Sequence, residues 1–394
     1  MAEPKVRFKR DDGSGYPAWI STPMGTIYRK VNEKNDLSFG RDKIISVANM
    51  FFKGSDDRDS LDDEYMKTYN VMRLGDIAFE GHENKEHQYG RFVANTIGDG
   101  IVSHIFVVLR PVDVNHNQQY WQYVINNEKV LGPVLRHSTK KSTMMHDLVI
   151  DDFLKRKIAV PCLEEQKKIA DFLSSVDDVI TASEEEVANL ETQKKAVMKK
   201  IFSQEVRFKR DDGTEFPEWE EKVFTDVAQL INGRAYSANE MLESGKYMIL
   251  RVGNLFSSNE YYYSDMELDD DKYINEGDLI YAWSATFGPR IYHGEKCIYH
   301  YHIWKVIPYS VEKNYFLHFL YADVENLQCE LNGGTMKHIT KEIMEKRFIP
   351  LPCKDEQRLI ADFLSDFDEA IAAAKKELEL WKELKKGLLQ QMFV

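Results

Sequence analysis

The stretch "PCLEEQKKIADFLSSVDDVI", Pro161 to Ile180, returns 191 positions later as "PCKDEQRLIADFLSDFDEAI", Pro352 to Ile371. The register of this repeat holds to the end of the chain, where Phe202 corresponds to Phe393. In each copy a proline fixes the start of a helix, and two acidic residues follow at its positive end. The sequence therefore predicts two long helices of one design.

An apolar seam with a seven-residue period runs along both predicted helices and indicates a coiled coil. The alternative is a single amphipathic helix on a globular core, but two matching seams in one chain favour mutual pairing. A lysine at the same seam position of each helix either sets the register or places its charge near acidic residues of the other helix. The predicted pairing residues include Leu173, Ile180, Val187, Leu190, Lys194 and Val197 in the first helix and Leu364, Ile371, Leu378, Trp381, Lys385 and Leu388 in the second.

A second repeat, "VRFKRDDG", occurs at Val6 to Gly13 and at Val206 to Gly213. The second copy begins four residues after Phe202, where the first long helix is expected to end. The stretch is therefore predicted to lead from each helix into the following domain, so that the two chain ends lie side by side. Its basic residues suit either a structural role, which we favour, or a nucleic-acid patch.

Between these blocks the two halves have diverged into short runs rich in β-branched and aromatic residues, which indicate strands. "RLGDIAFEG" (73–81) resembles "NEGDLIYAW" (275–283), "VANMF" (47–51) resembles "VGNLF" (252–256), and "IVSHIFVVL" (101–109) is a strand candidate. The expected fold class is α+β, with two mixed α/β domains separated by two long antiparallel coiled-coil helices in a pseudo-two-fold repeat. The expected domains are 1–152 and 203–343, and the expected helical segments are 153–202 and 344–394.

The composition, 43% hydrophobic and 30% charged residues among 394, is that of a globular protein, and no apolar run is long enough to cross a bilayer. The first ten residues lack the apolar core of a signal peptide, and four dispersed cysteines without a CxxC motif disfavour disulfides and zinc. The cytoplasm is therefore the expected location. The net charge of −13 disfavours a nucleic-acid partner, but binding depends on local patches.

No phosphate-binding glycine loop, dinucleotide motif or HExxH motif occurs, so an enzyme is not expected and we predict no catalytic and no metal-binding residues. His300 and His302 in "YHYHIW" are expected to alternate on a strand. For these two side chains packing or DNA contact is favoured over metal binding, because no third ligand lies nearby in sequence.

The order and duplication of "IAVPCLEEQKKIADFL", "IPLPCKDEQRLIADFL", "GDIAF" and "GDLIY" resemble the specificity subunit of type I restriction-modification systems over the whole chain. The resemblance implies two target recognition domains that each read one half of a bipartite, asymmetric site on double-stranded DNA. It also implies that the helix pair sets the unread spacer and docks two modification (methyltransferase) subunits. Restriction subunits with translocase and nuclease activity would join them. S-adenosylmethionine, ATP and magnesium would be bound by those partners and not by this chain.

The spacer can be estimated from the helix length. Glu164 to Phe202 is 39 residues, or about 58 Å at the helical rise, which spans about 17 base pairs of B-DNA. If each domain covers ~4 base pairs, about 6 to 9 pairs remain unread. A rival hypothesis is a coiled-coil scaffold whose two β-rich domains bind proteins and read no DNA, which the acidic balance favours.

Candidate DNA-binding residues are polar and basic side chains in loops of the diverged regions, where base-edge and phosphate contacts are usually made. Glycines in these loops permit close backbone approach. The alternative for each is a solvated surface position. The candidates are His82, Asn84, Lys85, Arg91, Arg136, Lys140 and Lys141 in the first half and Arg234, Tyr236, Ser284, Thr286, Arg290, Thr335, Lys337 and His338 in the second.

Overall fold

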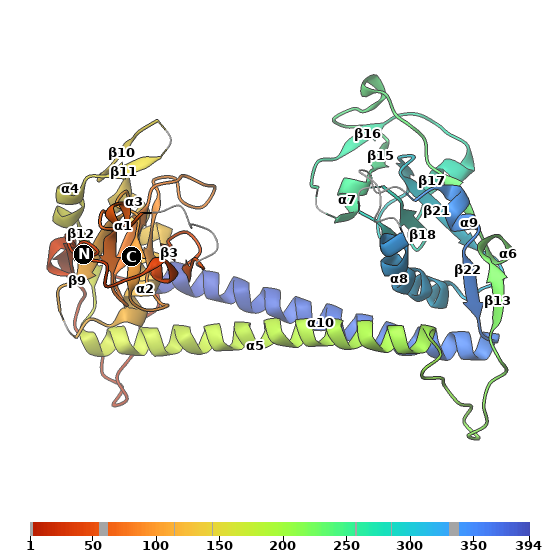
Figure 1. Ribbon diagram of the computed structural model, residues 1–394, viewed down its shortest axis with the longest axis horizontal. Coiled ribbons are helices and arrows are strands. Elements are labelled where there is room, and N and C mark those ends of the chain that lie inside the picture. The colour runs from red at the N-terminus through yellow and green to blue at the C-terminus, as the bar shows by residue number, and fades with distance from the viewer. Residues whose placement is uncertain are drawn as a thin grey trace. The chain divides into compact units, whose positions relative to one another are not determined.

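The computed structural model describes residues 3–54, 62–113, 115–143, 145–256, 258–284, 286–330 and 339–394, with the backbone alone at 328–330. The chain forms two compact units, Met1–Ser183 with Glu377–Val394, and Glu184–Lys376 (Figure 1). Each unit holds part of both long helices, α5 (Leu163–Phe202) and α10 (Lys354–Met392). The predicted segments divide the chain at the helix ends instead, and these boundaries stay a prediction. None of the described helices is long and apolar enough to cross a membrane.

The first unit is built around an antiparallel sheet of strand order β2-β9-β6-β7. Trp19, Phe92 and Phe153 are buried in its core, which also receives Leu173 from α5 and Met392 from α10. The elements of this unit are β1 (Ile20–Pro23), β2 (Tyr28–Lys30), β3 (Ile45–Ser46), β4 (Phe51–Phe52), α1 (Asp63–Met66), β5 (Asn70–Met72), β6 (Ile77–Glu80), β7 (Arg91–Ala94), β8 (Gly100–Val102), β9 (Val107–Pro111), α2 (Gln118–Ile125), α3 (Glu128–Arg136), β10 (Thr139–Lys141), β11 (His146–Leu148), α4 (Ile150–Lys155) and β12 (Lys157–Val160).

The second unit repeats this plan with a sheet of order β14-β21-β18-β19. It also has a second four-stranded sheet, β16-β15-β20-β17, where the first unit has the two-stranded sheets β3-β4 and β5-β8. Its main core surrounds Phe224, Trp304 and Phe316 and includes Ile201 of α5 and Leu364 of α10. The elements are β13 (Glu220–Val223), α6 (Phe224–Val227), β14 (Ala228–Asn232), β15 (Tyr247–Leu250), α7 (Val252–Phe256), β16 (Tyr262–Ser264), β17 (Tyr273–Ile274), β18 (Leu279–Ala282), β19 (Gly288–Ile291), β20 (Cys297–Tyr299), β21 (Ile303–Pro308), α8 (Lys313–Glu330), α9 (Lys341–Glu345) and β22 (Phe348–Leu351).

The two long helices pack together within each unit. In the second unit Glu191 of α5 pairs with Lys375 of α10 at 2.7 Å, and Lys194 of α5 pairs with Asp368 of α10. Residue numbers rise along α5 as they fall along α10, so the helices are antiparallel. The predicted seam side chains are all buried or half-buried. The predicted fold class, two mixed α/β domains with two long paired helices, is therefore confirmed.

The weak sequence matches between the halves mark equivalent strands and turns. The "GD" motif closes a tight turn in both units, because Gly75 and Gly277 adopt φ angles of 87° and 82°, which favour glycine. Asp76 accepts a hydrogen bond from the amide of Arg73, and Asp278 accepts one from Asn275, both at 2.8 Å. The motif is followed by β6 in one sheet and by the matching strand β18 in the other.

Two local expectations are wrong. The run 101–109, expected as one strand, is divided between β8 and β9, since Ser103 to Phe106 form a turn. His300 and His302, expected to alternate along a strand, lie in the turn that joins β20 to β21. In this turn the amide of Ile303 donates a hydrogen bond to the backbone carbonyl of His300 at 3.0 Å. In both cases a turn without glycine or proline interrupts an apolar run, which the pattern of residues alone does not reveal.

The "VRFKRDDG" repeat forms the same turn in both units. Gly13 and Gly213 have φ angles of 82° and 81°, and each donates its amide to the carbonyl of an arginine three positions earlier. Arg7 lies against the fully buried carboxylate of Glu165, with Nη2 2.8 Å from Oε2, and the indole of Trp19 donates to that carboxylate at 3.1 Å. The same three-residue set, which we call the clamp, recurs as Arg207, Glu356 and Trp219.

Candidate nucleic-acid interface

In the first unit, the predicted DNA-binding residues come from two stretches, 80–91 and 136–146, and these lie next to each other. The loop between β6 and β7 meets the β10–β11 hairpin through a hydrogen bond from the amide of His146 to the carbonyl of Gly81, at 2.8 Å. Lys141 of the hairpin forms an ion pair with Glu83 of the loop at 3.0 Å. A Cβ atom at Gly81 would lie 2.1 Å from the His146 carbonyl oxygen, so only glycine permits this approach.

Two side chains of this loop share one buried carboxylate. His82 places Nδ1 2.7 Å from Oε1 of Glu80, and Arg91 donates from Nε to Oε2 of Glu80 at 3.3 Å. Arg91 also donates to the carbonyl of Ala48 at 2.8 Å. Arg91 therefore braces the β3–β4 segment, whereas His82 is exposed and keeps Nε2 as the ring nitrogen that can meet a new partner.

The remaining candidates of the first unit divide into structural and exposed groups. The Oδ1 atom of Asn84 accepts hydrogen bonds from the backbone amides of Glu86 and His87, both at 2.9 Å, and so shapes the loop. Lys85, Arg136 and Lys140 are exposed and form no hydrogen bond or ion pair by their side chains with any described residue. These three cations are the ones that can reach a phosphate or a base edge without breaking a contact.

In the second unit, Arg234 is fixed in its loop by several contacts. Its Nη2 lies 2.6 Å from Oε1 of Glu240, and its guanidinium stacks 5.1 Å from the ring of Tyr236. The backbone of Arg234 exchanges hydrogen bonds with Tyr299 and Tyr301, both at 3.0 Å. The hydroxyl of Tyr236 is buried without a partner among the described residues, and burial raises its pKa to about 12.

A cluster of four rings, which we call the ring cluster, adjoins this arginine and consists of Trp283, His300, Tyr301 and His302. The rings of Tyr301 and His302 are 4.0 Å apart, and those of Trp283 and His302 are 5.0 Å apart. The Trp283 indole donates to the Tyr301 carbonyl at 2.8 Å. Burial lowers the pKa of His300 to about 4, so this imidazole is neutral at pH 7. The described residues contain no group of three metal-ligating side chains.

The other candidates of the second unit differ in their surroundings. Ser284 is only 7% exposed, and Arg290 donates to the hydroxyl of Tyr321 at 2.6 Å while stacking on Phe256. These two side chains are held inside the unit, whereas Thr286 is exposed. Thr335, Lys337 and His338 lie outside the described residues. Contact with DNA stays a prediction for every candidate.

Two features of these surfaces are absent from the candidate residues, although Trp283 begins a stretch, 283–290, that the sequence did indicate. Trp283 and Tyr301 are aromatic and partly exposed, and aromatic side chains can stack on bases. Lys43 lies over the ring of Phe52, 4.8 Å from its centre, beside the segment that Arg91 braces. The "YHYHIW" stretch and the repeated "VANMF" block were the available signals, but both also suit interior packing.

Comparison with known proteins shows to which family this chain belongs. A family model described as "Type I restriction modification DNA specificity domain" matches residues 88–192 and 217–380. The type I restriction enzyme MjaVIII specificity subunit of Methanocaldococcus jannaschii is 24% identical over 388 residues, covering 82% of this chain and 91% of its own.

Two solved structures share the fold. One, from work on complex assembly and conformational transition of the type I R-M system, matches with a TM-score of 0.61 and 17% identity, over 96% of this chain and 98% of that one. The type I restriction-modification S subunit from M. genitalium matches with a TM-score of 0.55 and 13% identity, over 100% and 99% of the two chains. With the family model covering more than half of its residues, the chain belongs to the family of type I restriction-modification DNA specificity subunits.

Proposed function

We propose that each unit reads one half of a bipartite, asymmetric DNA site, and that the α5–α10 pair sets the spacer and docks two modification subunits. The observation that carries this proposal is a duplicated frame bearing different loops. The clamp and the "GD" turn recur in both units. The loops beside the sheets have diverged, with a lysine-bearing hairpin in one unit and the ring cluster in the other.

The two surfaces suit two kinds of DNA contact. A two-stranded ribbon such as β10–β11 fits the major groove, where Lys140 and Arg136 are free to meet phosphates or guanine edges. In the second unit, Tyr301 and Trp283 offer ring faces and Arg234 offers a guanidinium already oriented by Glu240. Different contacts in the two halves would make the recognised site asymmetric.

We assign the catalytic steps of the complex to the modification and restriction subunits. We propose that this chain is non-catalytic, that the modification subunits bind S-adenosylmethionine, and that the restriction subunits use ATP and magnesium. With a net charge of −13, the chain needs cationic surfaces of its partners to neutralise phosphates. The isolated chain would therefore bind DNA weakly and gain affinity on assembly.

The test is to co-express the chain with the modification subunit of its own genome and to map methylated bases. We expect a two-part motif with a fixed gap. Duplicating residues 184–190 of α5 together with the matching residues 375–381 of α10 adds one heptad to each helix. Because this lengthens each helix by about 10 Å, the gap should grow by about three base pairs.

Both half-sites should stay unchanged in the lengthened variant, since no loop is altered. A duplication in α5 alone is the matched control and should abolish methylation by mispairing the helices. Methylation without a gapped motif, or a gap indifferent to helix length, would contradict the proposal. No methylation at all with an assembled complex would favour the rival hypothesis, a scaffold with two protein-binding domains.

A further inference from the structure

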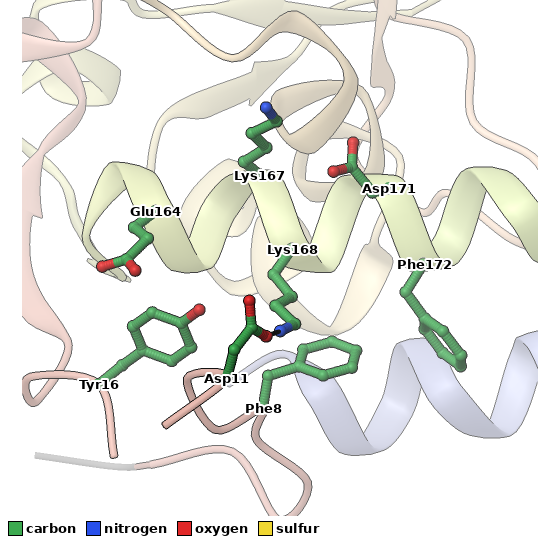
Figure 2. A pocket seen from close by; sticks show the side chains of 8 residues that line it. All are labelled: Phe8, Asp11, Tyr16, Glu164, Lys167, Lys168, Asp171 and Phe172. Atoms are coloured by element: carbon green, nitrogen blue, oxygen red, sulfur yellow. Dashed lines mark hydrogen bonds and ion pairs between the residues drawn. The ribbon is translucent and has the colours of Figure 1, made fainter. Parts of the chain in front are cut away.

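An open groove of about 550 Å³ lies in the first unit, between the "VRFKRDDG" turn and the first turns of α5 (Figure 2). Phe8 and Phe172 line one end, and their rings meet edge to face at 5.4 Å. Tyr16 lies at the other end under the guanidinium of Arg10, 4.9 Å from the ring centre. Lys168 and Asp11 form an ion pair across the groove at 2.5 Å.

The aromatic part of this surface recurs in the second unit, whereas Leu359 replaces Lys168, so the ion pair across the groove is not repeated. Phe208 and Phe363 occupy the positions of Phe8 and Phe172, 5.5 Å apart, and both pairs have interplanar angles of 70°. Arg210 lies 4.9 Å from the ring centre of Phe216, as Arg10 does over Tyr16. An apolar hollow of about 260 Å³ adjoins the Phe208–Phe363 pair.

The aromatic side chains that recur in both units are exposed. Folding alone does not require exposed side chains to be the same in the two halves. Phe172 and Phe363 are 36% and 37% exposed, and Asp171 and Asp362 beside them are exposed as well. Elsewhere on the outer face the halves differ, since the exposed Val179 corresponds to Ala370. Apolar side chains retained at equivalent exposed positions indicate a surface that binds the same partner twice.

The carboxylates next to the two exposed phenylalanines limit the chemistry of that partner, although Lys167 and Lys168 also line the first groove. Asp171 and Asp362 form no ion pair with any described residue. A carboxylate beside an exposed phenylalanine repels a phosphate backbone and attracts a cationic side chain. The fitting occupant is therefore a protein segment that packs an apolar side chain against the exposed phenylalanine and places a lysine or arginine near the aspartate.

We propose that these two grooves are equivalent docking sites for one such segment of the modification subunit, so that each groove holds one copy. This inference rests on the proposed function and goes further by assigning the contact to Phe172 with Asp171 and to Phe363 with Asp362. Because the sites are equivalent, the loss of one groove leaves the other functional and changes the stoichiometry from two copies to one.

The experiment measures, by native mass spectrometry and titration, how many modification subunits bind the full chain. The wild-type chain should bind two. Phe172→Ala and Phe363→Ala should each weaken one site at least tenfold and give predominantly one bound copy, and the double variant should bind none at the same concentrations. Asp171→Lys should act in the same direction as Phe172→Ala, through repulsion of the partner's cation. Val179→Ala, at an equally exposed apolar position of α5, should leave two copies bound.

Circular dichroism shows whether each variant is folded. Asp171→Lys, at an exposed position, provides a reading that does not depend on removing an aromatic ring. Two tightly bound copies on the folded double variant would overturn the inference while leaving the proposed function intact. A wild-type chain that binds no modification subunit would overturn the proposed function itself. Self-association of the chain that Phe172→Ala abolishes would identify a second copy as the occupant and would also overturn the inference.

Discussion

At the scale of single residues, the buried carboxylates of Glu165 and Glu356 explain why the "VRFKRDDG" block occurs twice in the chain. Each carboxylate has no exposed surface and accepts hydrogen bonds from an arginine and a tryptophan. The arginine belongs to the "VRFKRDDG" block, and the tryptophan lies six residues after that block. The glutamate comes from the first turn of a long helix. The basic residue of this clamp is therefore structural, in agreement with the favoured interpretation.

Glu165→Ala is expected to destabilise the first unit by about 3 kcal/mol, because it leaves the Arg7 charge and the Trp19 indole without their partner. Urea unfolding followed by fluorescence measures this loss. Glu164→Ala is the matched control at the adjacent position, where the pair with Arg10 is exposed and is worth about 0.5 kcal/mol or less. Equal effects of the two substitutions would show that the clamp has no special role.

At the scale of the elements, the two seam lysines form equivalent contacts between the helices. Lys194 of α5 pairs with Asp368 of α10, and Lys385 of α10 pairs with Asp177 of α5. The ammonium groups also lie 5.7 and 5.8 Å from the ring centres of Tyr321 and Tyr123. Of the two interpretations offered by the sequence, this geometry favours a lysine whose charge meets an acidic residue of the other helix.

Asp368→Ala is expected to destabilise the helix pair by about 1 to 2 kcal/mol, because it leaves the ammonium of Lys194, only 12% exposed, without its carboxylate. Lys194→Leu should instead be neutral or stabilising, since an apolar residue suits the seam position. Thermal unfolding of the two variants tests this opposition in sign. A destabilisation of similar size in both would mean that the ion pair itself contributes net stability.

At the scale of the whole molecule, the two chain ends meet in the same way as two segments that are joined by a continuous backbone in the second unit. In the first unit the amide of Val6 donates to the carbonyl of Gln391 at 3.2 Å. In the second unit the equivalent bond joins Val206 to Lys200, also at 3.2 Å, within one continuous segment. The prediction that the two chain ends lie side by side is therefore confirmed, and both ends are in the first unit (Figure 1).

A circular permutant that joins residue 394 to residue 1 through a short linker, with new ends near Gln204, should fold and direct methylation to the same motif. Gln204 has a φ angle of 59°, a conformation that is strained for a residue with a side chain. Opening the chain there removes that constraint. New ends placed between Val187 and Leu190, inside α5, are the control and should abolish methylation. An inactive Gln204 permutant that is folded would contradict the equivalence of the two junctions.

The sequence by itself determined the repeated frame and the family. The seven-residue apolar seam, the proline before each helix and the "GD" turn are local patterns whose physical meaning does not depend on distant residues. Their duplication made the fold class predictable, and every seam position is at least half-buried. The two misplaced strands show the limit of such patterns, because a turn inside an apolar run leaves no local signal.

Only the tertiary structure decided which distant side chains meet. Arg7 contacts Glu165 across 158 positions, and the close approach of Gly81 to His146 brings two loops together because the sheet sets their register. The same packing buried Ser284, held Arg290 against Tyr321 and left Lys140 exposed, although all three were candidates in the sequence. Local preference specifies elements, whereas the contacts of loop residues depend on the strands and helices packed around them, and that arrangement exists only in the folded chain.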